Sequence, residues 1–466
     1  MPVVTRLLDL IVNNAKIVTE SQVFDGSIGI QGDKIAHISG TIEEGANRVI
    51  DAKGKLLLPG LIDGHTHMEM PFMGTVSSDD FYQGTVAAAC GGVTTIVDFA
   101  VQPRGGTILD TYDMWRKKAD PKVCVDYALH MIIRDFNETN RKQIRNLIEE
   151  GVTSFKLFMA YKKELYLDDG AIYSIMDEVV KYGGLVGLHC ENADLIECFA
   201  ARLLSEGKVE AEYHAKSRPA LVEAEAVQRG IRLAEMSGSP MYVVHMSTGL
   251  ARDEIKESAD RGLPVYSETC PHYLTFTEEA YKRPNGNRYI MSPPLRSDED
   301  RTKLWQGLAN GFIKTVASDH VCFNSNQKNQ PDFTKVPNGV IGTEMILPIL
   351  YSGGVGKGIL PLTRLVQATS YNPSKLFGLY PKKGAIAVGS DADFVLLDPN
   401  KRVRLSVDNL HSNIDYSIYE DVTVTGYPVL TVSRGEIVYE DGQFIGKRGK
   451  GQFVKGKAFP VKRPDL

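Results

Sequence analysis

The middle of the chain alternates short apolar segments with segments whose apolar residues recur at helical spacing. Eight apolar segments can be counted, at residues 60–67, 94–100, 127–133, 154–160, 185–191, 241–247, 264–270 and 315–320. Strands buried on both faces of a parallel sheet carry such near-continuous apolar runs. Most steps between the segments are close to the roughly 30 residues of a βα unit. The pattern therefore predicts an α/β fold in which residues 58–382 form a (β/α)8 TIM barrel.

Helices are expected between these strands, most clearly at residues 193–207 and 220–238. Both segments place apolar residues at i, i+3 and i+4, and both end in a glycine that suits a helix C-cap. A doubly wound open sheet is the alternative fold. It is less favoured because the first βα turn lacks the GxGxxG fingerprint of that class.

The two ends of the chain have a different texture from the middle. Residues 1–57 and 383–446 both contain short strand-like runs punctuated by turn residues such as Gly-Asp. Because chain ends often lie close together in folded domains, the two segments are expected to form one small β-sandwich domain. The tail, residues 447–466, has no periodicity and is expected to run over the surface or onto a partner subunit.

Composition restricts the class of protein. The 466 residues are 43% apolar and 24% charged, with a net charge of −5 and no extended basic block, so nucleic acid and anionic membrane are not expected partners. No apolar run approaches the roughly 18 residues of a membrane span, and no secretory signal is visible. The six cysteines are scattered without a CxxC pair, which favours buried thiols and a cytoplasmic location.

Polar residues stand near the carboxyl ends of several predicted strands, where burial is costly unless the group is paired or bound to metal. In a barrel these ends converge on the mouth that holds the active site. Four imidazoles, one carboxylate and one amine suit a divalent first-row metal, most simply Zn²⁺, with Mn²⁺ or Co²⁺ as alternatives. The candidate ligands are His65, His67, Lys156, His189, His245 and Asp319.

Lys156 is the informative member of this set. A protonated lysine beside cations would be repelled, so its amine must be neutralised or chemically changed. Reaction with carbon dioxide would give an anionic carbamate, N6-carboxylysine. Its two oxygens could bridge two metal ions about 3.5 to 4 Å apart.

Several motifs together make the chain resemble the dihydropyrimidinase and D-hydantoinase family, cyclic amidohydrolases of the amidohydrolase superfamily. The motifs are DGHTH at 63–67, TSFKLFMAYK at 153–162, LHCEN at 188–192, VVHMS at 243–247, SPPLR at 292–296, ASDH at 317–320 and KVPNG at 335–339. The resemblance extends over almost the whole chain. It implies hydrolysis of a cyclic amide in 5,6-dihydropyrimidines or 5-monosubstituted hydantoins to N-carbamoyl amino acids.

The resemblance also implies roles for individual residues. One metal would be held by His65, His67, carboxylated Lys156 and Asp319, and the second by Lys156, His189 and His245. A hydroxide bridging the metals would attack the ring carbonyl, with Asp319 as proton shuttle. Tyr161 would hydrogen-bond the developing oxyanion, and the backbone groups of Ser292 and Asn338 would hold the cyclic imide.

Related enzymes and non-enzymes remain as alternatives. Dihydroorotases carry a carboxylate-binding arginine two positions after the second metal histidine. This chain has Glu69 there, which is expected to repel a substrate carboxylate. An allantoinase-type cyclic ureide hydrolase is the nearer alternative. The non-catalytic assembly proteins of this fold lack the metal site, whereas all six ligand positions are intact here.

Other expectations concern specificity, assembly and the remaining polar residues. Phe72, Phe158 and Leu165, with Met70, are expected to form an apolar wall around the exocyclic group of a small cyclic imide or ureide substrate. The chain is expected to form a homo-oligomer, a tetramer or a dimer. His130 is read as a hydrogen-bonded core histidine, and Glu268 is expected to have no metal role.

Overall fold

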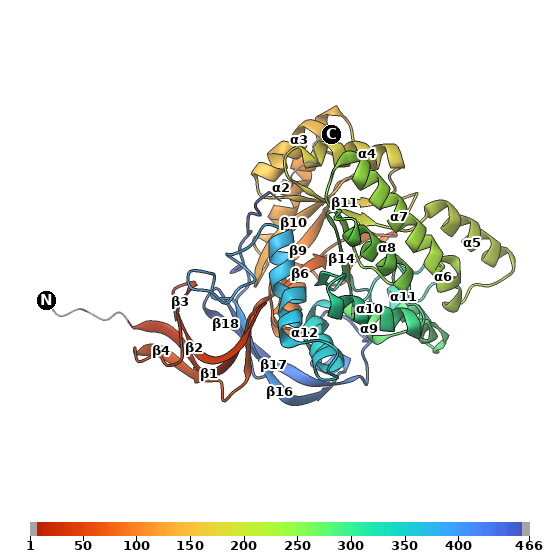
Figure 1. Ribbon diagram of the computed structural model, residues 1–466. Helices are drawn as coiled ribbons and strands as arrows, with labels where there is room; N and C mark the ends of the chain where they lie inside the picture. Colours follow the sequence, from red (N-terminus) through yellow and green to blue (C-terminus); the bar gives the residue numbers. More distant parts are fainter. Residues whose placement is uncertain (1–6, 459–466) are drawn as a thin grey trace.

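Eight parallel strands form the central barrel of this computed structural model, which describes residues 7–458 (Figure 1). Their spatial order is β15-β14-β13-β12-β11-β10-β9-β6. The circle is closed between its two end strands by a parallel bridge from Thr66 to His320. Each of the eight apolar segments overlaps one strand, so the predicted barrel is confirmed. The strands are β6 (Leu61–Thr66), β9 (Val93–Val101), β10 (Asp126–Ile132), β11 (Ser154–Phe158), β12 (Leu185–His189), β13 (Met241–Val243), β14 (Val265–Thr269) and β15 (Thr315–Val316).

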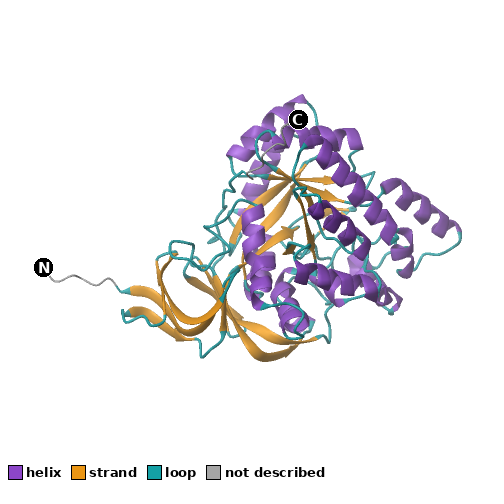
Figure 2. Ribbon diagram, viewed as in Figure 1, coloured by secondary structure: helices purple, strands orange, loops and turns teal. Residues whose placement is uncertain are grey.

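Helices surround the barrel (Figure 2). Helix α7 ends where the sequence indicated, since Gly238 adopts the left-handed conformation at its C-cap. The α-helices are α1 (Phe81–Cys90), α2 (Ile108–Ala119), α3 (Glu138–Glu149), α4 (Asp169–Val180), α5 (Ala193–Ser205), α6 (Glu212–Ser217), α7 (Ala220–Ser237), α8 (Gly249–Asp260), α9 (Pro271–Thr275), α10 (Asp298–Asn310), α11 (Ser325–Lys328), α12 (Ile346–Leu350), α13 (Leu362–Val366) and α14 (Asn372–Leu376). Shorter helical turns are η1 (Glu278–Lys282), η2 (Gly286–Tyr289), η3 (Thr343–Met345), η4 (Tyr351–Val355), η5 (Gln367–Tyr371) and η6 (Val407–Asn409).

The two chain ends build a separate, mainly antiparallel sheet, as the sequence predicted. Its order is β19-β18-β17-β16-β5-β1-β2-β3, with β4 paired to β1. The antiparallel pairing of β5 with β16 joins the amino-terminal and carboxyl-terminal halves. The strands are β1 (Leu8–Val18), β2 (Val23–Gln31), β3 (Lys34–Ser39), β4 (Ala46–Asp51), β5 (Leu56–Pro59), β16 (Phe394–Arg404), β17 (Thr423–Ser433), β18 (Glu436–Glu440) and β19 (Gln443–Phe444). A small hairpin of β7 (Pro71–Phe72) and β8 (Thr75–Val76) lies outside both sheets.

The tail crosses the amino end of its own barrel in the part that is described, residues 447–458. The amides of Gly451 and Val454 donate to the carbonyls of Val123 and Tyr127 at 3.0 and 2.7 Å. The ring of Phe453 lies edge-on to Tyr127, with the centroids 5.5 Å apart. A contact of the tail with a partner subunit stays a prediction, and residues 459–466 lie outside the described part.

The apolar core follows this division. The largest buried cluster joins the barrel strands to the covering helices. A second cluster fills the end sheet and includes Leu10, Ile28 and Phe394. Among the described residues, no helix is both long enough and apolar enough to cross a membrane.

Candidate metal centre and active site

The residues singled out from the sequence converge at the carboxyl mouth of the barrel. His65 and Lys156 lie in β6 and β11, His189 ends β12, and His245 and Asp319 follow β13 and β15 within a few residues. All six candidate ligands are buried. A cavity of about 40 Å³ is lined by five of them and by every predicted substrate contact: His67, Met70, Phe72, Lys156, Phe158, Tyr161, Leu165, His189, His245, Ser292, Asp319, Val321 and Asn338. His65 lies behind this cavity, against Asp319.

His65, His67 and Asp319 form one group that could hold a metal ion. One oxygen of Asp319 lies 3.2 Å from Nε2 of His65 and 3.3 Å from Nε2 of His67. Burial lowers the pKa of both imidazoles, so the rings are neutral and can offer a lone pair. Nε2 of His65 has no hydrogen-bond partner among the described residues. A cation among the three side chains would satisfy this buried nitrogen, so the donor set fits a metal.

His189 and His245 form a second group on the neighbouring strands. Nδ1 of His189 lies 2.9 Å from Nε2 of His245, and Nε2 of His189 donates to Glu191 at 2.7 Å. Glu191 also accepts from Arg218 at 2.6 Å. Burial alone would raise the pKa of Glu191, but the charge of Arg218 and the bond from His189 hold it at about 2. The carboxylate therefore fixes the His189 tautomer and leaves Nδ1 free to ligate.

Lys156 lies close to both groups. Its Nζ is 5.1 and 4.9 Å from the ring centroids of Phe99 and Phe158, and no carboxylate of the described residues forms an ion pair with it. Burial lowers the pKa of Lys156 to about 8. The amine is therefore neutral much more often than an ordinary lysine, and the neutral form is the one that reacts with carbon dioxide.

Three site residues have a left-handed backbone that non-glycine residues rarely adopt. The φ angles are 38° for His245, 49° for Asp319 and 61° for Tyr161. Each such residue stores strain of order 1 to 3 kcal/mol and persists only where its surroundings fix it. Their coincidence in one cavity is a structural sign of function that the sequence does not carry.

Asn338 connects the expected substrate contacts to each other. Its side-chain amide donates to the hydroxyls of Tyr161 and Ser292 at 3.1 and 2.9 Å. Nζ of the buried Lys328 donates to the carbonyls of Ile290 and Pro337, both at 2.8 Å. Lys328 thus ties together the two loops that carry Ser292 and Asn338.

A larger cavity of about 720 Å³ opens beside the reaction cavity. The two share Tyr161 and Asn338 in their walls. The outer cavity has an apolar part that includes Met73, Ile196 and Phe333. A ring bound near the ligands therefore has room on one side for a substituent.

Sequence reasoning missed the residues that orient the ligands. Glu268, expected to have no metal role, accepts a hydrogen bond from Nδ1 of His65 and so turns Nε2 toward Asp319. Burial raises the pKa of Glu268 to about 8. Glu191 likewise orients His189, by accepting from its Nε2. Both glutamates are charged residues within or beside apolar strand segments, and that was the available signal.

Three other assignments changed or gained detail. Glu69 forms an ion pair with Lys122 and does not line the reaction cavity, so its charge is not presented to a substrate. Nε2 of His130 donates to the carbonyl of Gly64 at 3.0 Å, and its Nδ1 accepts from the hydroxyl of Ser154, as expected of a hydrogen-bonded core histidine. Cys198 is exposed on α5, whereas the other five cysteines are buried.

Comparisons with known proteins agree with this geometry. A model of the amidohydrolase family matches residues 56–438. The chain is 42% identical to a D-hydantoinase of Geobacillus stearothermophilus over 96% of both chains. It is 40% identical to a dihydropyrimidinase of Rattus norvegicus over 88% of this chain and 81% of the relative. The solved structure of a dihydropyrimidinase from Brevibacillus agri superposes with a TM-score of 0.95 at 41% identity, covering 97% of this chain and 99% of that one.

Proposed function

The chain belongs to the amidohydrolase family and is a metal-dependent cyclic amidohydrolase, and we propose that its substrates are 5,6-dihydropyrimidines and 5-monosubstituted hydantoins. Ring opening would give N-carbamoyl amino acids. The observation that carries this proposal is the single cavity in which the candidate ligands meet Tyr161, Ser292 and Asn338. The names of the relatives cited above point to the same two substrate classes.

The metal centre is part of the proposal. His65, His67, carboxylated Lys156 and Asp319 would hold one ion, and Lys156, His189 and His245 would hold a second. Zn²⁺ suits this mixture of imidazole and oxygen ligands, with Mn²⁺ and Co²⁺ as alternatives. Two such ions supply Lewis acidity and lower the pKa of water toward neutrality, which hydrolysis of an unactivated amide needs.

Each remaining step is assigned to a residue of the chain. Asp319 would take the proton of the attacking water and return it to the leaving amide nitrogen, since its carboxylate lies beside both His65 and His67. The Tyr161 hydroxyl would donate to the developing oxyanion, as its position beside Asn338 allows. Backbone groups of Ser292 and Asn338 would hold the imide and orient the scissile bond.

Turnover of four ring compounds by the zinc-loaded protein tests the substrate assignment. We expect ring opening of dihydrouracil and of 5-phenylhydantoin. Dihydroorotate should be a poor substrate because the lining of the reaction cavity includes no arginine, and Arg218 of the outer cavity is already paired with Glu191. Preferred turnover of allantoin would overturn the assignment in favour of a ureide hydrolase.

Mass analysis of the metal-loaded protein tests the modified lysine. We expect an added carboxyl group on Lys156, and Lys156→Ala should lose most metal and activity. Short carboxylic acids should restore part of the activity by replacing the missing carbamate oxygens. A fully active two-metal enzyme with an unmodified Lys156 would overturn this part.

Location and assembly belong to the same proposal. A cytoplasmic location is supported by six free cysteines, five of them buried. A homo-oligomer, tetramer or dimer, can be tested by sedimentation of the metal-loaded protein.

A further inference from the structure

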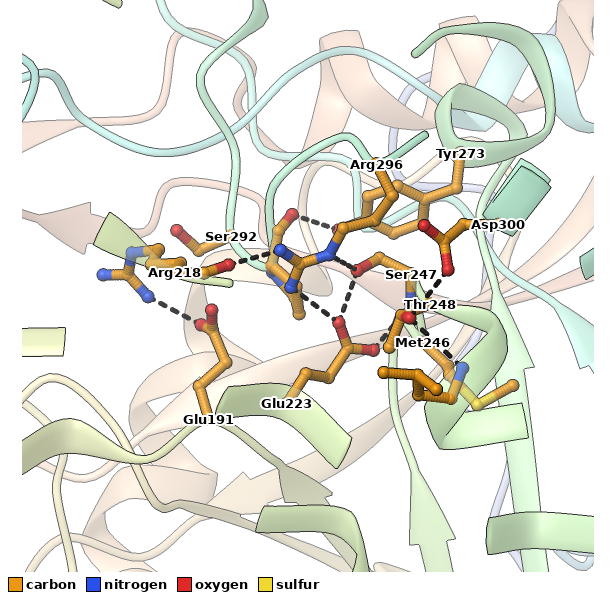
Figure 3. Close-up of polar contacts among 12 residues, drawn as sticks. Glu191, Arg218, Glu223, Met246, Ser247, Thr248, Tyr273, Ser292, Arg296 and Asp300 are labelled. Carbon is orange, nitrogen blue, oxygen red and sulfur yellow. Dashed lines mark hydrogen bonds and ion pairs between the residues drawn. The ribbon is translucent and has the colours of Figure 1, made fainter. Parts of the chain in front are cut away.

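A network of buried charged side chains adjoins the group formed by His189 and His245. Figure 3 shows its members Glu191, Arg218, Glu223 and Arg296. At its centre is Arg296, the last residue of the SPPLR motif, with 7% of its surface exposed. Its charge is balanced by Glu223 on α7, also buried, whose Oε2 accepts from Nη2 at 2.9 Å. An arginine placed this deep needs most of its donors satisfied, and its partners show what it joins.

The first arm of Arg296 leads to His245. Nε of Arg296 donates to Oγ of Ser247 at 3.0 Å, and Ser247 stands two residues after His245. Oε1 of Glu223 accepts from the amide of Ser247 at 2.8 Å, and Oε2 accepts from its hydroxyl. Ser247 is thus held at both its backbone and its side chain. Because the backbone of His245 has a positive φ, this hold just beyond it keeps the ring aimed at the cavity.

The second arm leads to His189. Nη1 of Arg296 donates to the backbone carbonyl of Arg218. Nη1 of Arg218 in turn donates to Glu191, which accepts from Nε2 of His189. The guanidinium of Arg218 also lies 5.5 Å from the ring centroid of Tyr161.

The third arm of the network is the backbone segment from Ser292 to Arg296. Ser292, at its start, is an expected substrate contact, and Arg296 is its last residue. Tyr273 donates to the carbonyl of Pro293 at 2.6 Å, and Tyr281 accepts from the amide of Leu295 at 2.9 Å. Figure 3 shows Arg296 between the Ser292 side and the Ser247 side of this network.

We infer that Arg296 is a positioning residue that sets His189 and His245 relative to each other and to Ser292, and thereby tunes the affinity of the second metal ion. This inference rests on the proposed function, which supplies the two metal sites. The planar guanidinium donates at fixed angles to three acceptors, which are the Ser247 hydroxyl, the Glu223 carboxylate and the Arg218 carbonyl. A lysine ammonium on a flexible stem cannot hold all three. Within residues 7–458, no hydrogen bond or ion pair joins His65, His67 or Asp319 to this network, so the first ion should be little affected.

Zinc titration of metal-free protein against a chromophoric chelator tests the inference. Wild type should bind two ions per chain. Arg296→Lys should keep the affinity of the first ion and weaken the second 10- to 100-fold, roughly the usual effect of removing an outer contact from a ligand. The KM for dihydrouracil should also rise, because the loop from Ser292 to Arg296 is held less firmly when the bonds of Arg296 to Ser247, Glu223 and Arg218 are lost.

Arg116→Lys is the matched control. Arg116 on α2 is partly buried, bonds the hydroxyls of Tyr127 and Tyr112, both at 2.8 Å, and lines neither the reaction cavity nor the outer cavity. We expect this control to lower Tm while leaving both zinc affinities unchanged. A loss of the second ion that merely follows Tm in both variants would overturn the positioning role.

Two milder variants keep the test decisive if Arg296→Lys folds poorly. Ser247→Ala removes one contact of the first arm, and Glu191→Gln weakens the end of the second. Each should selectively weaken the second ion. In the double variant, the affinity for the second ion should fall by less than the product of the two separate fold-changes if both residues act through Arg296. Unchanged second-ion affinity in both single variants would refute the inference, whereas a wild type that binds fewer than two ions would refute the proposed metal centre instead.

Discussion

Nδ1 of His189 lies 2.9 Å from Nε2 of His245, at the carboxyl ends of two adjacent barrel strands. The N–H of His189 is directed to Glu191, so the nitrogen that faces His245 carries a lone pair. Burial keeps both rings neutral, since it lowers the pKa of each. Two neutral imidazoles that present nitrogens to one point are suited to chelating one cation.

The first prediction follows from this pair. His189→Ala should bind about one zinc ion per chain, because the ion between His65, His67 and Asp319 keeps its ligands. Metal analysis after dialysis measures the stoichiometry. His130→Asn is the control, since His130 is a buried histidine that bonds Gly64 and should leave both ions in place. A variant at His189 that still holds two ions would remove this residue from the centre.

The second prediction concerns proton transfer by Asp319. Asp319→Asn should fold, since the amide is nearly isosteric, yet lose activity by about 10² to 10⁴, the usual scale of general acid-base catalysis. Metal content must be measured on the same sample, because Asp319 is also a proposed ligand. Near-normal turnover with two ions bound would exclude the role.

The sequence was informative where a signal is local. Eight apolar segments marked the barrel strands, because a strand covered on both faces must be apolar along its length. The same rule made three site residues visible, because polar side chains are rare in such apolar segments. These residues are Lys156, His189 and His245. The small β domain followed from a change in texture at both chain ends.

The parts that escaped prediction depend on contacts between distant segments. Glu268 bonds His65 across 203 positions, and Lys328 joins loops whose adjacency exists only in the folded chain. The positive φ of Tyr161 is likewise imposed by its surroundings and leaves no trace in composition. The expected repulsion of a substrate carboxylate by Glu69 failed for the same reason, because the ion-pair partner of Glu69, Lys122, lies far along the chain.

The third prediction concerns the junction of barrel and end sheet. Buried Lys383 bonds Asp126 at 2.5 Å, Asp391 at 2.9 Å and Asp393 at 2.6 Å. Lys383→Met would leave these carboxylates buried side by side, and losing one partner of such a group costs about 3 to 5 kcal/mol. Urea denaturation should show a loss of that size. Lys455→Met removes an exposed pair with Glu150 and should change stability by less than about 1 kcal/mol.

The fourth prediction is a pH dependence of stability. His214 is buried, and its Nε2 donates to the carbonyl of Met291 at 2.8 Å. Burial lowers the pKa of His214 to about 3. The unfolded chain binds a proton there near pH 6.5, and the folded chain does not. Stability from this residue is thus complete above pH 6.5 and is lost as the pH falls toward 3, by about 1.4 kcal/mol per pH unit.

The matching variant for that prediction is His214→Gln, whose amide can still donate to Met291. Unfolding free energy of the metal-free protein, measured between pH 5 and 7, should fall less steeply in the variant than in wild type. Metal-free protein is used because acid also strips metal from histidine ligands. Identical slopes would contradict a neutral buried His214.

The last prediction concerns selection of the exocyclic group. Phe72, Phe158 and Leu165 line the reaction cavity, and the ring of Phe72 lies edge-on to Tyr161 at 5.3 Å. An apolar wall in this place favours a hydantoin with an aromatic substituent over one with a polar substituent. The alternative is that these side chains only pack the rim of the barrel.

Trimming the wall separates the two cases. Phe72→Ala and Leu165→Ala should change the ratio of kcat/KM for 5-phenylhydantoin to that for dihydrouracil, since each lost contact contributes about 1 to 3 kcal/mol. Rim packing alone would lower Tm and leave the ratio fixed.

Leu147→Ala, in the buried face of α3, is the control for lost core volume. It should lower Tm by a cavity effect while both substrates keep their relative rates, because this helix packs on the outside of the barrel. A substrate ratio that moves in the control as much as in the wall variants would leave only the rim-packing role for Phe72 and Leu165.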